Sequence, residues 1–240
     1  MRIATWNCNM AFRRKFARLL DLKPDLAVIP ECESREFLAA EAAFKPSSAI
    51  WIGDNPCKGL GVFAFGAFRA RLDLLHRPDI PYAVPLRIGG PVKLRLLAVW
   101  ACHHKPNSFE NRIGPLRRAL REYERFLTGS PVVVTGDFNN NVYWDRPSHP
   151  NNHAAAVDDL RRLGLESAYH VARGVAQGEE PEPTLYWRDR RRDGPIYHID
   201  YCFIPKRWTH RLARVDVGNF DDWVGAGLSD HVPLLVEIAT

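Results

Sequence analysis

Acidic, amide and histidine side chains recur along this chain of 240 residues, each at or beside an apolar run of the strand type. The set consists of Asn7, Glu31, Asp137, Asn139, Asp200, Asp230 and His231. Side chains at the ends of neighbouring strands can converge on one edge of a sheet, so we expect these residues to meet although they lie far apart in sequence. Their oxygens are the donors that a hard cation prefers, and a cation held in this way can activate water against a phosphate.

The runs that must position these residues alternate between strand and helix patterns near the N-terminus. Ile3–Trp6 and Asp25–Ile29 have the pattern of strands. Between them, Phe12–Leu20 is amphipathic, with apolar side chains at helical spacing and basic ones elsewhere around it. A strand, a helix and a second strand in this order predict a parallel strand pair with the helix on one face.

The rest of the chain is rich in predicted strands, with helices between them. The strand candidates are Ala49–Ile52, Gly61–Ala67, Arg69–Asp73, Lys93–Trp100, Val132–Thr135, Ile199–Ile204 and Val232–Ile238, and the helix candidates are Pro115–Leu127 and His153–Leu163. Strands that return repeatedly between helices fit two packed sheets with helices outside. We therefore expect an α/β fold in a single domain over residues 1–240, with Gly174–Pro183 as an irregular excursion.

Composition limits the classes of function. The formal net charge of +5 and the pI of about 9.0 mildly favour a polyanionic partner. The five cysteines are odd in number and no pair has Cys-x-x-Cys spacing, so a disulfide framework and a structural zinc site are not expected. No apolar run is long enough to span a bilayer, and the N-terminus lacks the pattern of a signal peptide. We therefore expect a cytoplasmic protein with no membrane partner.

Five short motifs occur in an order that identifies a family. They are Thr5-Trp6-Asn7, Pro30-Glu31, Gly136-Asp137-Phe138-Asn139, His198-Ile199-Asp200-Tyr201 and Ser229-Asp230-His231-Val232-Pro233. In this order they resemble the endonuclease/exonuclease/phosphatase superfamily, with its deoxyribonuclease I-like and apurinic endonuclease-like members. The resemblance covers most of the chain. It implies a four-layer α/β sandwich of two packed mixed β-sheets flanked by helices, and Mg2+-dependent hydrolysis of phosphodiester bonds, with Mn2+ as a substitute ion.

The resemblance also implies a role for each residue of the metal set. Glu31 matches the principal metal carboxylate of the family, and Asn7 matches the amide beside it. Asp230 matches a second acidic position near the metal. Magnesium keeps several of its waters, so one or two carboxylates suffice to hold it.

The remaining motif residues are implied to act on water and phosphate. Asp137 and Asn139 match the pair that aligns or deprotonates the attacking water and holds a phosphate oxygen. His231 matches the histidine that donates to the scissile phosphate, and Asp200 matches the carboxylate that fixes its tautomer. The sequence leaves open whether Asp137 or His231 is the general base.

Each motif also has a plain structural alternative when it is taken alone. Asn7 could cap a turn, Gly136-Asp137-Phe138-Asn139 could form one, and Ser229-Asp230 could cap the last strand. Glu31 could be a solvated loop acid, and for Glu33 we keep that interpretation. The joint occurrence of the motifs in family order favours the functional interpretation.

The sequence departs from the family pattern at two places. Pro30 stands where the family usually has Gln, so an amide beside the metal carboxylate is lost. Trp100 ends the run Leu96–Trp100 where many family nucleases carry Tyr or His, and it cannot accept a proton. We expect Trp100 to contact substrate. His103 fits the place of a catalytic histidine in deoxyribonuclease-like members, and its neighbour His104 either lines the site or lies in a solvated loop.

Further candidates could bind the substrate. Asn141 extends the Gly-Asp-Phe-Asn turn and could line the site. Tyr186 and Trp187 could stack on a base or could be ordinary core residues. The run Arg188–Arg192, which includes Arg190 and Arg191, could grip phosphates or be a solvated loop.

Three classes of function remain to be compared. Nucleic acid, DNA or RNA, is favoured as the partner of a monomeric nuclease by the basic charge and the arginine run. A phosphatase or phosphodiesterase for a small or lipid phosphate is the alternative, although the Trp-Cys-Asp-Arg motif of the inositol phosphatases is missing from the sequence. A binding module without activity is the third class, and it would be expected to lack residues such as Glu31 and His231. This sequence retains both.

Overall fold

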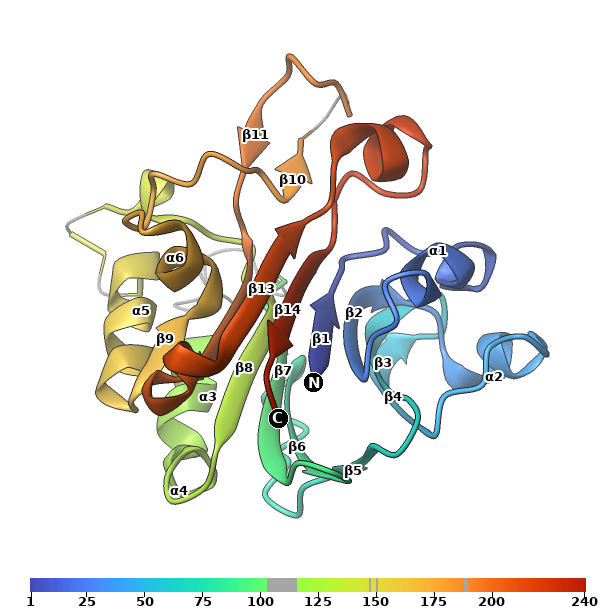
Figure 1. Cartoon of the computed structure of the whole chain (residues 1–240), viewed down its shortest axis with the longest axis horizontal. Coiled ribbons are helices and arrows are strands. Elements are labelled where there is room, and N and C mark those ends of the chain that lie inside the picture. The colour runs from blue at the N-terminus through green and yellow to red at the C-terminus, as the bar shows by residue number, and fades with distance from the viewer. Residues whose placement is uncertain (103–115, 147, 150, 188–189) are drawn as a thin grey trace.

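A computed structural model describes the chain except for residues 103–115, 147, 150 and 188–189 (Figure 1). Two six-stranded sheets dominate it, with strand orders β13-β14-β1-β2-β4-β3 and β5-β6-β7-β8-β12-β9. The first sheet contains β1 (Arg2–Thr5), β2 (Leu26–Cys32), β3 (Ser48–Asn55), β4 (Lys58–Ala64), β13 (Leu212–Val217) and β14 (Leu234–Ile238). The second contains β5 (Arg69–Leu72), β6 (Ala83–Gly89), β7 (Leu94–Trp100), β8 (Val132–Asp137), β9 (Leu165–Ser167) and β12 (Asp200–Pro205).

Helices and a short hairpin complete the fold. The α-helices are α1 (Phe16–Leu20), α2 (Arg35–Ala39), α3 (Leu116–Glu122), α4 (Glu124–Leu127), α5 (His153–Arg162) and α6 (Ala168–Arg173). The hairpin pairs β10 (Leu185–Tyr186) with β11 (Ile196–Tyr197), and short helical turns cover Phe12–Arg14, Val142–Trp144, Lys206–Arg211 and Asp221–Gly225. No helix in the described part of the chain is both long enough and apolar enough to cross a bilayer.

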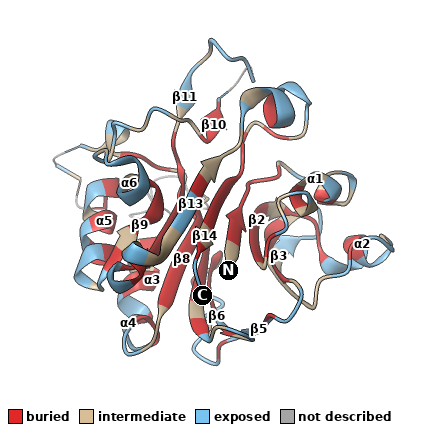
Figure 2. Ribbon diagram, in the orientation of Figure 1, coloured by how far each residue is buried: buried red, intermediate tan, exposed pale blue. Residues whose placement is uncertain are grey.

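Three apolar clusters define four layers. The largest lies between the sheets and includes Val28 of the first and Leu96 of the second. A second cluster packs the outer face of the second sheet against α3 and α5, and a third covers the outer face of the first sheet with Phe12 and Phe16. Figure 2 shows the buried residues concentrated along the strands. The predicted four-layer α/β sandwich is confirmed.

Each sheet is mixed, because it contains one parallel strand pair among antiparallel ones. The pair β1–β2 is parallel, with Thr5 beside Val28, and its crossover carries α1 as predicted. The pair β7–β8 is also parallel, with Trp100 beside Asp137. A parallel pair brings two carboxyl ends to the same edge of a sheet, so each sheet presents chain ends at the place where the candidate site forms.

Two predicted helices are interrupted. The segment 12–20 is a helical turn over Phe12–Arg14 followed by α1, because Lys15 leaves helical geometry with φ −127°. The Lys15 ammonium donates to the carbonyls of Cys8 and Asn9, at 2.7 and 3.2 Å, and so is directed back toward the candidate site. The segment Pro115–Leu127 divides into α3 and α4 at buried Tyr123, and Pro115 lies outside the described residues.

Several elements were not predicted. They are β6, β9, β13, the β10–β11 hairpin, α2 and α6. In β6 the strand pattern of the sequence is obscured by Pro85. This residue pairs with Leu97 of β7, and it lies one residue beyond the last β5–β6 pair, Leu72 with Leu86. Proline is tolerated there because the pairing with β5 has ended. The excursion 174–183 has no helix or strand, as predicted.

Candidate active site

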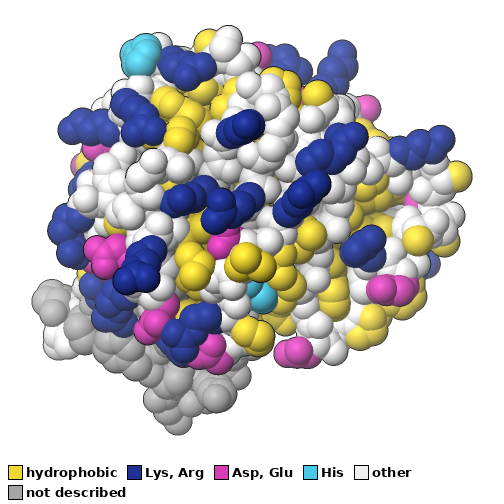
Figure 3. Space-filling model, turned by 90° about the horizontal axis from the view of Figure 1, so that it is seen from below, with side chains coloured by type: hydrophobic (Ala, Val, Ile, Leu, Met, Phe, Trp, Pro, Cys, Tyr) yellow, Lys and Arg dark blue, Asp and Glu magenta, His cyan; other side chains and the backbone are white. Residues whose placement is uncertain are grey.

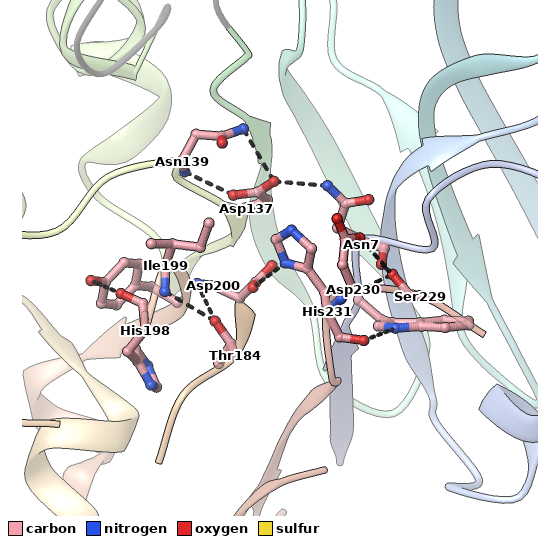
Figure 4. A network of polar contacts seen from close by, with 12 residues as sticks. Asn7, Asp137, Asn139, Thr184, His198, Ile199, Asp200, Ser229, Asp230 and His231 are labelled. Carbon is pink, nitrogen blue, oxygen red and sulfur yellow. Dashed lines mark hydrogen bonds and ion pairs between the residues drawn. The ribbon is translucent and has the colours of Figure 1, made fainter. Parts of the chain in front are cut away.

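The ends of five strands converge at one edge of the two sheets. Asn7 follows β1, Glu31 lies near the end of β2 and Asp137 ends β8. Asp200 begins β12 directly opposite Asp137, and His231 precedes β14. Figure 4 shows the side chains of Asn7, Asp137, Asp200 and His231 gathered in one network. The predicted convergence is therefore observed, with both sheets contributing.

The imidazole of His231 is paired with a buried carboxylate. His231 Nδ1 lies 2.8 Å from Asp200 Oδ2, and both side chains are almost fully buried. The backbone N–H of Asp200 donates to Thr184 Oγ1 at 3.1 Å, which holds the start of the strand in place. Burial alone would lower the pKa of His231, but the charge and hydrogen bond of Asp200 outweigh burial and raise it to about 10. The imidazole is therefore a cation near neutral pH and can donate a proton or hydrogen bond from Nε2.

Asp137 is a buried carboxyl group that accepts three hydrogen bonds. They come from Asn7 Nδ2 at 3.0 Å, from the backbone N–H of Asn139 at 2.8 Å and from Asn139 Nδ2 at 3.2 Å. Burial and the nearby charge of Asp200 raise the pKa of Asp137 to about 7, against the opposing effects of His231 and Asn7. A carboxyl group with a pKa near 7 is suited to general base catalysis at neutral pH.

Unusual backbone geometry aims two of the site residues. The register of β2 against β4 shifts between Pro30 and Cys32, so Glu31 lies at a bulge with φ +58°. Asn139 also adopts a left-handed backbone, with φ +50°. Bulges redirect side chains, and left-handed conformations of residues other than glycine are concentrated at functional sites.

Gly136 must be glycine at its place in β8. Its φ is +145°, and a Cβ there would lie 1.8 Å from the carbonyl oxygen of Val99 on the neighbouring strand. The absence of a side chain allows β7 and β8 to approach closely just before Asp137. This gives the glycine of the Gly-Asp-Phe-Asn motif a structural reason.

The predicted metal residues Glu31 and Asn7 are in contact. Asn7 Nδ2 lies 3.3 Å from Glu31 Oε1, and Lys58 Nζ lies 3.2 Å from Glu31 Oε2. Lys58 was not predicted, and its ammonium also lies 5.5 Å above the ring of Trp100. Trp100 is only 4% exposed and packs on Tyr82, so the structure does not favour the predicted contact of Trp100 with substrate.

Asp230 joins this set through Asn9, which sequence reasoning missed. Asn9 Nδ2 donates to Asp230 Oδ1 at 2.9 Å, and the backbone N–H of Asn9 donates to Asn7 Oδ1 at 3.0 Å. Asn9 therefore bridges two of the three predicted metal residues. Its signal in the sequence is weak, since an Asn two residues after Asn7 is also common in turns.

The donor atoms fit a hard cation. Glu31, Asn7 and Asp230 offer oxygen donors. The neighbouring Cys8 stays a neutral thiol, because burial raises its pKa to about 12. Among the described residues, Asp137, Asp200 and His231 form one further cluster, with ligand atoms all within 4.8 Å of one another.

Asn141 lines the cleft beside Tyr143 and Tyr197, and its side-chain amide is held by hydrogen bonds. Its Nδ2 donates to the His198 carbonyl at 3.0 Å, to Tyr201 Oη at 3.1 Å and to Glu180 Oε2 at 3.2 Å. Glu180 Oε1 lies 2.9 Å from His170 Nε2. Burial would raise the pKa of Glu180, but hydrogen bonds, chiefly from His170, lower it to about 2. This buried group ties the excursion 174–183 to the segment that carries Asp200.

The predicted aromatic pair divides into one buried and one exposed ring. Tyr186 is 8% exposed and packs on Phe220 at 4.9 Å, so it cannot offer a free face to a base. Its backbone N–H donates to the Asp230 carbonyl at 2.8 Å, which makes it a support of the site. Trp187 is 42% exposed and remains able to stack.

The arginine run is exposed where it is described, and Arg188 lies outside the described residues. Arg191 pairs with Asp193, and Arg192 pairs with Asp221. Arg190 has no carboxylate partner among the described residues, and its charge acts on Lys15 together with those of Asp230 and Glu31. His103 and His104 also lie outside the described residues.

A surface of aromatic rings beside the site was missed by sequence reasoning. Tyr143 is 74% exposed, and its ring lies 5.9 Å from Tyr197. Trp144 and Trp187 also contact Tyr197, at 4.4 and 6.2 Å. A cleft of about 330 Å³ opens beside Tyr143 and Tyr197. In sequence, Tyr143 closely follows the Asp137–Asn139 motif and Tyr197 shortly precedes Asp200.

Comparison with known proteins agrees with this geometry. The sequence model of the endonuclease/exonuclease/phosphatase family matches residues 4–231. None of the curated proteins compared with the sequence matches it.

Three solved structures illustrate the likeness of fold. A 3'-5' exonuclease, NExo, from Neisseria meningitidis is 17% identical, with all of both chains covered and a TM-score of 0.69. An AP endonuclease from Archaeoglobus fulgidus is 18% identical, with the same full coverage and TM-score. A Neisseria 3' phosphatase, NExo, bound to a product DNA hairpin is 18% identical, again with full coverage and with a TM-score of 0.73. At these identities the likeness shows the fold.

Proposed function

The chain belongs to the endonuclease/exonuclease/phosphatase family and is a hydrolase of phosphate esters, and from this premise we propose that it cleaves phosphodiester bonds of nucleic acid with Mg2+ as the cofactor. The observation that carries the proposal is the placement of Asp137 between Asn7 and Asn139, beside the His231–Asp200 pair. This arrangement combines a base with a pKa near 7 and a cationic donor.

We assign the general base to Asp137 and the donor to His231. Asn7 and Asn139 hold the Asp137 carboxylate so that its free lone pair can accept a proton from the attacking water. His231 is held by Asp200, and its Nε2 has no partner among the described residues. From Nε2 it donates to a non-bridging oxygen that gains charge in the transition state. The sequence left this choice open. With a pKa of about 7, Asp137 can take up a proton at neutral pH, whereas His231, with a pKa of about 10, already carries one, and this difference supports the assignment.

Glu31, Asn7 and Asp230 would hold the cation. When bound, Mg2+ supplies a positive charge that polarises the phosphate and stabilises the leaving oxygen. Asn9 orients both Asn7 and Asp230 toward that role. Mn2+, which also accepts oxygen donors, is expected to substitute.

Two features support nucleic acid as the substrate. The exposed rings of Tyr143 and Trp187 beside Tyr197 offer faces on which bases can stack. Arg190, whose charge acts on Lys15, has no carboxylate partner among the described residues and could bind a backbone phosphate. A minimal phosphate ester would use neither feature.

The test is a panel of substrates assayed with Mg2+ and with excess chelator. Single-stranded and duplex DNA, RNA, an abasic duplex, inositol phosphates and bis(p-nitrophenyl) phosphate would be compared, with His231→Ala as the inactive control. We expect turnover of at least one nucleic acid that stops in chelator and returns when Mg2+ is restored. Preferential turnover of inositol phosphates would favour the alternative, a phosphatase for small or lipid esters. Full turnover in excess chelator would remove the metal from the mechanism.

A further inference from the structure

A basic groove lies at the opposite end of the second sheet from the candidate active site. It has a volume of about 520 Å³ and is lined by Arg69, Arg71, Arg87, Ile88, Gly89, Gly90, Lys93, Leu94, Arg95 and Ser130. Five of these residues are cationic and none is acidic. Figure 3, which views the molecule from below, shows Lys and Arg side chains across the middle of that face.

The pairing of the strands places three arginines in a row. Arg71 of β5 opposes Arg87 of β6, and Arg87 opposes Arg95 of β7. All three lie on the outer face of the sheet, because their neighbours Ala70, Leu86 and Leu96 belong to the core between the sheets. Like charges directly opposite each other on neighbouring strands destabilise a sheet, so this row gains from an anion that binds across it.

Little negative charge within the protein compensates these cations. Arg87 pairs with Asp73 at 2.6 Å. Arg95 donates to three main-chain carbonyls at the end of α4, and Arg69 donates to two carbonyls in its own turn. These acceptors are uncharged, so they do not neutralise either guanidinium. Arg71 and Lys93 are exposed and have no hydrogen-bond or ion-pair partner among the residues that the structure describes.

The floor of the groove is open to a ligand. Gly89 opposes Arg69 on the neighbouring strand, and a Cβ at Gly89 would meet no atom within 4 Å. Gly90 turns the chain with φ +133°, a conformation that favours glycine. Gly89 therefore leaves the space beside Arg69 free of a side chain.

We propose that this groove, with Arg71 and Lys93 as its free cations, is a second binding site for the phosphate backbone of nucleic acid, separate from the active site. The choice of nucleic acid as occupant rests on the proposed function. The row from β5 to β7 crosses two strand spacings, about 10 Å. A nucleic-acid strand carries a phosphate at every nucleotide, so the row is long enough to meet more than one phosphate.

The groove and the active site are too far apart to share one phosphate. The groove touches Leu94 and Arg95 at the start of β7, whereas Trp100 at its other end lies beside Asp137. At roughly 3.3 Å per residue the two ends are about 20 Å apart. A strand held in the groove would therefore be retained by the protein independently of cleavage.

The test uses the full chain in excess chelator, so that binding is measured without turnover. Fluorescence anisotropy of a labelled single-stranded oligonucleotide is followed over a series of KCl concentrations. Arg71→Ala/Lys93→Ala should raise the dissociation constant about tenfold and flatten the plot of log affinity against log salt by about 1.4, since each lost phosphate contact removes about 0.7. Lys206→Ala/Arg207→Ala, which removes two exposed cations outside the groove, should leave the slope near that of the unaltered protein.

Two further measurements separate this inference from the proposed function. Hydrolysis of bis(p-nitrophenyl) phosphate should be unchanged in Arg71→Ala/Lys93→Ala, because the active site is intact. If the unaltered protein cleaves no nucleic acid, the proposed function fails, yet the anisotropy slope still decides whether the groove binds a phosphate backbone. An unchanged slope in the groove variant overturns the inference. Loss of binding to phosphatidylserine vesicles in Arg71→Ala/Lys93→Ala, with oligonucleotide binding intact, would overturn the inference in favour of a membrane surface.

Discussion

The side-chain amide of Asn7 joins the two sheets, because its Nδ2 donates to Asp137 Oδ2 at 3.0 Å across a separation of 130 residues. The same amide lies 3.3 Å from Glu31. The candidate base and the candidate metal carboxylate are therefore positioned by one small group at the seam between the sheets.

Replacing Asn7 with Ala should disturb both carboxylates at once. Loss of an orienting contact typically lowers metal affinity or activity about 10- to 100-fold. A hydrogen bond to a charged group contributes about 1.5–3 kcal/mol, so urea unfolding should show a loss of this order. Asn55→Ala, in an exposed turn, is the matched control. Normal activity and metal affinity in Asn7→Ala would show that Asp137 and Glu31 are positioned without it.

Replacing His231 with Ala should lower kcat about a hundredfold or more at pH 7, because the cationic donor is lost. The fold should survive, and circular dichroism would check this. Asp200→Asn keeps the imidazole but removes the charge behind it, so it should give a smaller loss and a changed pH profile. Near-normal turnover of His231→Ala with saturating metal would contradict the assignment, and His103 would be tested next.

The stability of the protein in chelator should fall between pH 6.5 and about 10. The folded-state pKa of His231 is raised to about 10 by Asp200, from an ordinary value of 6.5. A raised histidine pKa stabilises the fold fully below pH 6.5, and this contribution is lost as the pH rises through 10. Asp137 acts in a different window, since its raised pKa lowers stability progressively as the pH rises from about 4 to 7, and this loss persists above pH 7. Above pH 7 the melting temperature of Asp200→Asn should depend less on pH than that of Asp158→Asn, which changes an exposed carboxylate and serves as the control.

Glu31→Gln should weaken Mg2+ binding and the rate together. The amide keeps the shape of the side chain but removes a charge that a hard cation needs. A titration of activity with Mg2+ would measure this as a shift to higher concentration, and Glu36→Gln, at an exposed carboxylate, is the control. Glu33 is unsuitable as a control, because it is buried and paired with Arg13 rather than solvated as predicted. An unchanged titration in Glu31→Gln would remove Glu31 from the metal ligands.

Arg190→Ala should weaken oligonucleotide binding more than Arg191→Ala or Arg192→Ala. The latter two arginines are already paired with Asp193 and Asp221, whereas Arg190 has no carboxylate partner among the described residues. Trp187→Ala should cost about 1–3 kcal/mol if the ring stacks on a base. Anisotropy would measure each, with bis(p-nitrophenyl) phosphate hydrolysis as the internal control. If all four changes have negligible effects on binding, the arginine run is a solvated loop and Trp187 does not stack on a base.

The sequence predicted the polar centre well because its signals are local. Asp137, Asp200 and His231 each adjoin an apolar run, and a short run of a few residues suffices to find them. The catalytic and metal roles themselves stay predictions, as do the cytoplasmic location, the monomeric state and the single domain over residues 1–240. The two-sheet sandwich was also predictable, because strands that alternate with helices have few ways to bury both of their faces.

The residues that were missed have no local signature. The Asn9–Asp230 contact spans 221 residues. Lys58, the first residue of β4, contacts Glu31 of the neighbouring strand β2. The structure does not favour the predicted contact of Trp100 with substrate, and the position of Trp100 in β7 gives the reason. It has the same strand parity as Leu94 and Leu96, which face the core between the sheets.

The backbone of Glu31 places folding and chemistry in conflict at one residue. A left-handed conformation costs any side chain about 1–3 kcal/mol, and glycine would escape this cost. Glycine would also remove the carboxylate. Selection for thermal stability alone would therefore favour the loss of Glu31, so a stabilised descendant with glycine here should have lost its activity. Directed evolution for heat resistance without an activity screen would make this trade visible.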